Sequence, residues 1–164
     1  MTQALLDYLK QLCIDHADFR HDDASNRAYF EFDYKSMTEA RQRNKYVLFV
    51  NKLQGKYNDN KGDYKTDQSY VTALFLVKME SKNLSQARQY FLECKTHMDQ
   101  FLRKMEYDRE NSLVPSTCKL LRHVDYDEIT WEFADITNDL WTGVQMRIPF
   151  RYELTAEYDP SKWT

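Results

Sequence analysis

Hydrophobic and polar residues alternate along five stretches of the chain, and this period of two predicts β-strands. The expected strands cover residues 27–34, 45–53, 69–79, 129–136 and 142–154. The stretch 45–53 is partly apolar on both faces, so we expect it at the centre of a sheet. The stretch 142–154 contains Pro149, which cannot donate a hydrogen bond to a neighbouring strand. We therefore expect this last strand at an edge of the sheet, or with a local bulge.

Two other stretches repeat their hydrophobic residues at intervals of three and four, which predicts amphipathic helices over 3–16 and 84–106. In the second helix the apolar positions are Leu84, Ala87, Phe91, Cys94, Met98, Phe101 and Met105. Asn83 or Ser85 is suited to capping its N-terminus.

The remaining segments are expected to connect these elements. Residues 35–44 are polar, with room for one helical turn, and residues 55–65 form the most polar stretch, which predicts a long exposed loop. A connector over 108–118 leads to a short strand near 119–126. Residues 155–164 are expected to form a C-terminal arm.

The expected element order is therefore α-β-β-β-α-β-β-β within a single domain, residues 1–154. Strands that come in runs predict an α+β fold with a mostly antiparallel sheet. Two main helices packed on one face would cover the apolar side chains of that sheet.

Composition narrows the classes of function. Lys and Arg number 23 against 26 Asp and Glu, so the net charge of −3 provides no basic field for nucleic-acid binding. Three glycines cannot build a glycine-rich phosphate loop.

Three widely spaced cysteines favour a reducing compartment. The start of the chain lacks the apolar region of a signal peptide, and the longest uncharged apolar run, 73–77, is too short to span a membrane. We expect synthesis in a cytoplasm and no membrane partner.

Candidate chemistry is sparse. Cys94 and His97 are one helical turn apart, and His16 and His21 are five residues apart, but neither pair has the spacing of a zinc site. No nucleophile elbow accompanies the four histidines and three cysteines. We expect no catalytic residue, no cofactor and no metal site.

Two arginines on the last strand are open to two interpretations. Arg147 and Arg151 share one face of this strand with Gln145 and Glu153. They are suited to reach the acidic groups of a partner, since arginine is enriched at interfaces. An ordinary solvated sheet face explains the same pattern equally well.

The C-terminal part carries a resemblance to a known class of proteins. Its segments are Ile129–Phe133, Asn138–Gly143, Val144–Phe150 and Tyr158–Trp163. With the element order and the length, these segments resemble the small neck, tail-completion and tail-terminator proteins of tailed bacteriophages. They are also similar in style to portal-associated ring proteins. The loop 55–67 and the extended tail depart from this pattern.

The resemblance implies a structural virion protein without catalytic residues. Such proteins form closed rings, of six-fold or twelve-fold symmetry, between the portal and the tail. Genomic DNA leaves through the central channel without specific binding. On this expectation the partners are copies of the chain, the portal and tail or other neck proteins, and the location is the virion.

Partner contacts are expected at the last strand, at the polar loop and at the tail. The residues expected to make them are Arg147, Arg151, Trp141, Trp163, Tyr57 and Tyr64. Deleting the tail should block particle assembly and leave the domain folded. Two rival functions stay open: a small cytoplasmic enzyme or ligand-binding domain with an aromatic-lined pocket, and a cytoplasmic adaptor.

Overall fold

A computed structural model describes residues 2–39, 45–58, 66–80, 82–136 and 140–153 of the chain. Its elements are α1 (Thr2–Asp15), β1 (Tyr29–Glu31), α2 (Tyr34–Glu39), β2 (Tyr46–Asn58), β3 (Thr66–Lys78), α3 (Leu84–Asn111), α4 (Pro115–Leu121), a 3-10 turn η1 (Tyr126–Glu128), β4 (Thr130–Ile136) and β5 (Trp141–Glu153).

The five strands form one sheet in the order β1-β2-β3-β5-β4. β1 runs parallel to β2, and every other neighbouring pair is antiparallel. The expected α+β class with a mostly antiparallel sheet is confirmed. The strand that begins at residue 46 is second in the order, next to the short β1, and the middle strand is β3.

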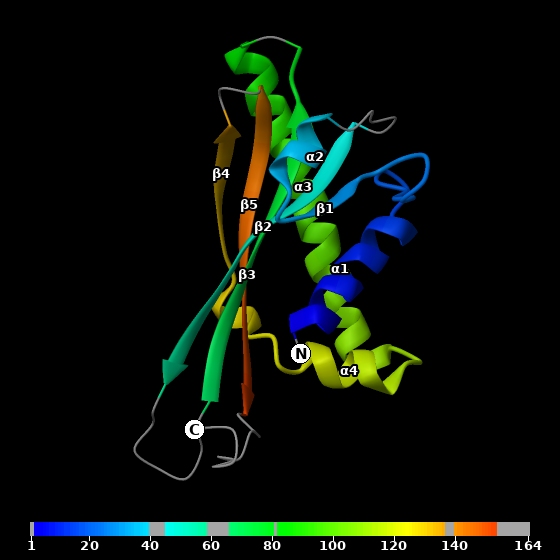
Figure 1. Cartoon of the computed structure of the whole chain (residues 1–164), viewed down its shortest axis with the longest axis vertical. Helices are drawn as coiled ribbons and strands as arrows, with labels where there is room; N and C mark the ends of the chain where they lie inside the picture. The colour runs from blue at the N-terminus through cyan, green and yellow to red at the C-terminus, as the bar shows by residue number, and fades with distance from the viewer. Residues whose placement is uncertain (1, 40–44, 59–65, 81, 137–139, 154–164) are drawn as a thin grey trace, which may run out of the picture.

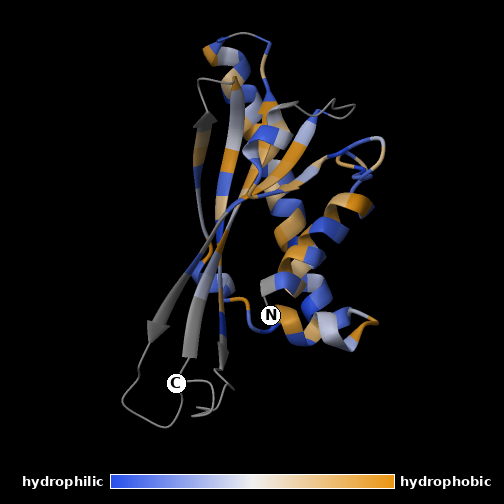
Figure 2. Ribbon diagram, in the orientation of Figure 1, coloured by the Kyte–Doolittle hydropathy of each residue, from blue (hydrophilic) through white to orange (hydrophobic). Residues whose placement is uncertain are grey.

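Both faces of the sheet carry a hydrophobic core. Helices α1, α3 and α4 gather on one side (Figure 1), where their apolar stripes meet side chains such as Phe75, Met146 and Phe150. The opposite face carries a smaller core under α2, built around Met37 and Trp141. Figure 2 shows the apolar stretches along α1, α3 and the strands. Because strand residues alternate between faces, one alternating sequence supplies both cores.

The hairpin of β2 and β3 is longer than expected. Each strand has 13 residues, and the pairing continues to Asn58 opposite Thr66. The predicted exposed loop over 55–65 is therefore wrong for residues 55–58; residues 59–65 lie outside the described part of the chain. Polar residues form strand here because each strand satisfies the backbone groups of the other, which needs no apolar face.

Two predicted strands also need correction. The first is limited to Tyr29–Glu31, because Phe32 has a φ of 53° and turns the chain toward α2. The segment 119–126 is no strand: α4 covers Pro115–Leu121, and only Val124 forms an isolated bridge, with Phe150. Pro115 stands in the first turn of α4, where its missing N–H is tolerated and its fixed φ favours a helix.

Helix α3 confirms the predicted cap. The Asn83 side chain accepts hydrogen bonds from the N–H groups of Ser85 and Gln86, which would otherwise lack partners. The helix continues to Asn111, beyond the predicted end at residue 106.

Strand β5 lies between β3 and β4 as far as Arg147, so most of it is not at an edge, whereas the part that contains Pro149 pairs with β3 alone. The pairing with β4 ends at Arg147. Beyond that point the Asp125 N–H donates to the Pro149 carbonyl at 3.0 Å, and the Arg151 N–H donates to the His123 carbonyl at 2.8 Å. Because the N–H and C=O of a strand residue point to one side, the missing donor of Pro149 faces this irregular segment and costs no ladder bond with β3.

One buried hydroxyl on β5 provides a stability test. The Thr142 Oγ1 is fully buried and has no hydrogen-bond partner among the described residues. Valine has the same shape without the polar atom, so Thr142→Val should raise the free energy of unfolding by about 1 kcal/mol. Denaturant unfolding of both proteins measures this difference. An equal or lower stability of the variant would show that the hydroxyl is satisfied.

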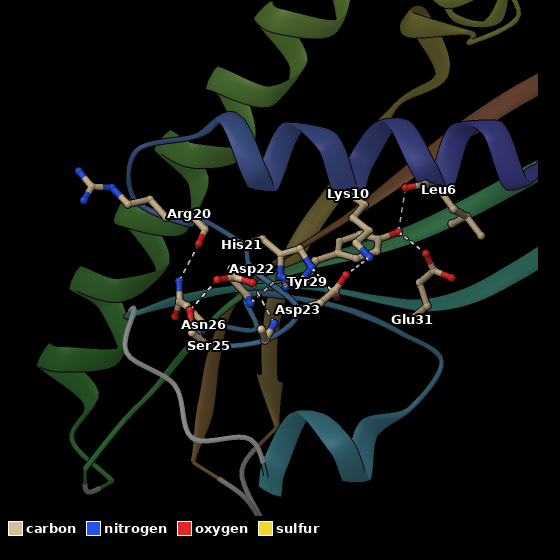
Figure 3. Close-up of polar contacts among 12 residues, drawn as sticks. Leu6, Lys10, Arg20, His21, Asp22, Asp23, Ser25, Asn26, Tyr29 and Glu31 are labelled. Carbon is tan, nitrogen blue, oxygen red and sulfur yellow. Dashed lines mark hydrogen bonds and ion pairs between the residues drawn. The ribbon is translucent and has the colours of Figure 1, made fainter.

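The segment between α1 and β1 is organised by His21 (Figure 3). Its Nδ1 accepts hydrogen bonds from the N–H groups of Ala28 at 3.1 Å and Tyr29 at 3.3 Å, and its Nε2 lies 3.1 Å from the Asp23 carboxylate. An Nδ1 that accepts bonds from N–H groups must be unprotonated, so this ring is neutral. Lys10 of α1 also binds Asp23, at 2.7 Å.

The neutral ring makes stability depend on pH. Burial lowers the pKa of His21 from its ordinary value of 6.5, with Lys10 and Arg27 acting in the same direction and Asp23 opposing them. The unfolded chain takes up this proton near pH 6.5, while the folded chain resists it. The free energy of unfolding should therefore fall as the pH drops through 6.5, until the folded pKa is passed.

Denaturant unfolding at pH 7 and pH 5 measures this fall. The fall should be smaller in His21→Gln, which keeps a donor and an acceptor without titrating. The variant His123→Gln, at a half-buried histidine outside this segment, should keep the full fall. Equal falls in all three proteins would contradict the role assigned to His21.

Candidate interaction surface

The sheet has open edges at both of its ends. β4 pairs only with β5 among the described residues, so its other edge presents free backbone groups. At the opposite end, β1 covers β2 only from Leu48 to Val50. The outer edge of β2 from Asn51 to Asn58 therefore has no partner strand within the described chain. Unpaired strand edges are sites where another chain can add a strand.

An aromatic patch lies beside the β4 edge. Trp131 and Phe133 are 50% and 49% exposed, although both are large and apolar. Their rings lie 6.2 and 5.6 Å from the ring of Phe91, which α3 supplies. The ammonium group of Lys95, one turn further along α3, lies 4.8 Å from the centre of the Trp131 ring. We call these four residues the β4 patch.

The alternation of β4 explains this arrangement. Trp131 and Phe133 share the face that looks toward α3, and Ala134 is buried on the other face. An inner strand would bury such side chains between two neighbours, but β4 has a neighbour on one side only. Half of each aromatic surface thus remains available to a partner.

The other face of the same edge is polar. The Gln145 amide donates to the Glu132 carboxylate at 2.7 Å, and the Arg147 guanidinium stacks 3.8 Å from the centre of the Tyr70 ring. Gln145, Glu132 and Arg147 line a hollow of about 460 Å³, together with Thr72 and Gln54 among others. Arg147 lies on β5 opposite Thr130 of β4, and its contact with a partner stays a prediction.

Arg151 lies in a different environment. Its guanidinium forms ion pairs with Asp125 at 3.1 Å and with Glu128 at 2.8 Å. These contacts tie the end of β5 to the turn η1. Arg151 thus has its ion-pair partners within its own chain, although its side chain remains half exposed.

The expectation for Trp141 requires a correction. This residue is 1% exposed and belongs to the core under α2, so the fold does not offer it to a partner. The backbone of Tyr57 belongs to β2, while its side chain, Tyr64 and Trp163 lie outside what the structure describes.

The two buried thiols, Cys13 and Cys94, are not activated. Burial raises the pKa of Cys94 to about 12 and also raises the pKa of Cys13, which keeps both thiols protonated at neutral pH. Both side chains pack as small apolar groups against the helix-covered face of the sheet.

Comparisons with known proteins do not assign the chain to a group. No known protein family, curated protein or solved structure matches it significantly. Within the described residues, no helix has both the length and the apolar character needed to cross a membrane.

Proposed function

We propose that this chain is a structural subunit that assembles head to tail into a closed ring. In this arrangement the β4 edge of one copy joins the outer edge of β2 in the next copy. The observation that carries the proposal is the presence of two different open edges at opposite ends of one sheet. Contacts between two different surfaces close into rings when the rotation between copies allows it.

The residues at the β4 edge support the proposal that this edge contacts another copy of the chain. Natural proteins usually shield an open edge with charges, proline or a very short strand. β4 has seven residues, and two half-exposed aromatic side chains accompany its free edge. Aromatic residues are enriched in protein interfaces and often supply most of the binding energy. Joining the edge to a neighbour would bury them and pair the free backbone groups.

A ring in the neck of a tailed bacteriophage is the setting we propose. The support for it is the resemblance of the C-terminal half and the head-to-tail geometry that the two edges favour. A net charge of −3 is compatible with a channel through which DNA slides without binding. Mass spectrometry of purified phage particles tests this setting: the chain should be found there with portal and tail proteins.

The rival proposal is a small ligand-binding domain. The polar hollow beside Arg147 is the observation on which it rests. That proposal predicts a monomer or dimer that binds a small molecule. The ring proposal predicts a larger assembly that binds no small molecule.

Cysteine cross-linking tests the contact itself. We would place one cysteine on each edge, Glu132→Cys on β4 and Gln54→Cys on β2, in separate chains that carry Cys118→Ser. The remaining Cys13 and Cys94 are buried. Within one chain β3 and β5 separate the two edges by about 14 Å, too far for a disulfide.

A mixture of the two variants should form a disulfide-linked pair upon oxidation, and each variant alone should not. A control mixture with Lys119→Cys on α4 in place of Glu132→Cys should stay unlinked. Cross-linking of Glu132→Cys with itself would indicate a two-fold contact between β4 edges and contradict the ring. No cross-linking in any mixture would contradict an edge contact.

A further inference from the structure

A cluster of metal-ligating side chains lies between α1 and α3, away from both sheet edges. His16 follows the last residue of α1, Asp18 comes two positions later, and His97 projects from the middle of α3. One ligand atom from each of these three residues lies within 4.8 Å of the others. Sequence spacing could not reveal the cluster, because 81 positions separate the two histidines.

Gln100 brings a fourth donor into the cluster. Its Oε1 lies 2.9 Å from His16 Nε2 and 3.3 Å from His97 Nδ1, and His97 Nδ1 lies 3.8 Å from Asp18 Oδ2. Zinc bonds of 2.0–2.1 Å in tetrahedral geometry require ligand atoms about 3.3–3.4 Å apart. The three observed separations bracket this value, so small side-chain movements would suffice to enclose an ion.

The surroundings hold the donors in place. The His97 ring packs 4.2 Å from the Tyr46 ring and 5.5 Å from Phe19, and the His16 ring lies 5.3 Å from Phe19. His97 is buried, whereas the Asp18 side chain is 55% exposed. The cluster therefore has a fixed inner wall and an open side through which an ion can enter.

We propose that His16, Asp18, His97 and Gln100 form a binding site for a divalent transition-metal ion, with zinc as the representative ion. Two imidazole nitrogens, a carboxylate and an amide oxygen are a donor set that suits zinc, and also cobalt or nickel. The ion would fasten the end of α1 to α3. Because the folded chain gathers these donors, binding would stabilise the fold.

Coordination also predicts a change at one backbone amide. In the metal-free arrangement His16 Nδ1 accepts a hydrogen bond from the Asp18 N–H at 3.2 Å, so the ring proton resides on Nε2. An ion bound at Nε2 displaces that proton, and a neutral ring then carries its proton on Nδ1. The Asp18 N–H must give up its bond, which an amide NMR spectrum can detect.

Calorimetric titration of the tag-free full chain with zinc chloride tests the proposal. We expect one ion per chain, a raised unfolding temperature and a shifted Asp18 amide resonance. The variants Asp18→Ala and His16→Gln, at positions that are not buried, should each weaken binding by roughly tenfold or more. His123→Gln, which removes a histidine outside the cluster, should bind zinc as the unchanged chain does.

Two results would overturn the site. One is that the unchanged chain does not bind zinc, and the other is that Asp18→Ala and His16→Gln bind zinc as tightly as the unchanged chain. Circular dichroism of the variants verifies that they fold. The outcome is independent of ring formation, because none of the four donors belongs to a sheet edge.

Discussion

Replacing Trp131 and Phe133 together with lysine is expected to convert the assembled chain into monomers. Both side chains accompany the β4 edge and are half exposed, so lysine can reach solvent in the isolated chain. In the proposed ring the same positions are enclosed by the neighbouring copy, so the two added charges would be removed from solvent. Loss of an aromatic residue that is a hot spot of an interface costs about 2 kcal/mol or more, which corresponds to roughly 30-fold weaker association. Sedimentation velocity over a range of concentrations measures the change.

The matched control places two lysines elsewhere on the surface. Leu113 and Val114 are 99% and 54% exposed in the connection between α3 and α4. The variant Leu113→Lys/Val114→Lys adds the same charge and should leave the assembly intact. An assembly that survives the β4 substitutions, or that both double variants disrupt equally, would contradict the assignment of the β4 patch to the contact.

Gly143→Ala is expected to destabilise the fold strongly, by about 3 kcal/mol or more. Gly143 lies near the start of β5, between Leu76 of β3 and Ala134 of β4. A Cβ atom at this position would lie 1.9 Å from the carbonyl oxygen of Phe75 and 2.9 Å from its carbon. Neither atom can move as a flexible side chain does, so β3 and β5 must separate locally. Such overpacking of a core exceeds the ordinary cost of an added methyl group.

Guanidinium unfolding at a fixed protein concentration measures this loss. Gln145→Ala changes a half-exposed side chain two residues further along the same strand and should cost less than about 1 kcal/mol. An alanine at position 143 with the stability of the unchanged chain would mean that the two strands are further apart than described.

Local patterns predicted the elements whose side chains face a core. The three-four spacing of α3 and the alternation of β5 are direct consequences of burial on one side. The pattern failed where backbone pairing or a turn decided the structure. Residues 55–58 form strand because β3 pairs with them, and Pro115 begins a helix in a region expected to form a connector and a strand.

The candidate sites depend on information that no local pattern contains. Trp131 and Phe133 resemble any buried pair on a strand, and only the strand order shows that β4 is an edge. His16 and His97 meet because α1 packs beside α3 on one face of the sheet (Figure 1). The expectation that Trp141 contacts a partner fails because the core under α2 encloses this side chain.

Native mass spectrometry of the purified full chain tests the central claim most directly. Our account predicts one dominant species, whose mass corresponds to a fixed number of copies greater than two, as in a closed ring. A chain that stays monomeric or stops at a dimer, at all concentrations measured, would contradict it.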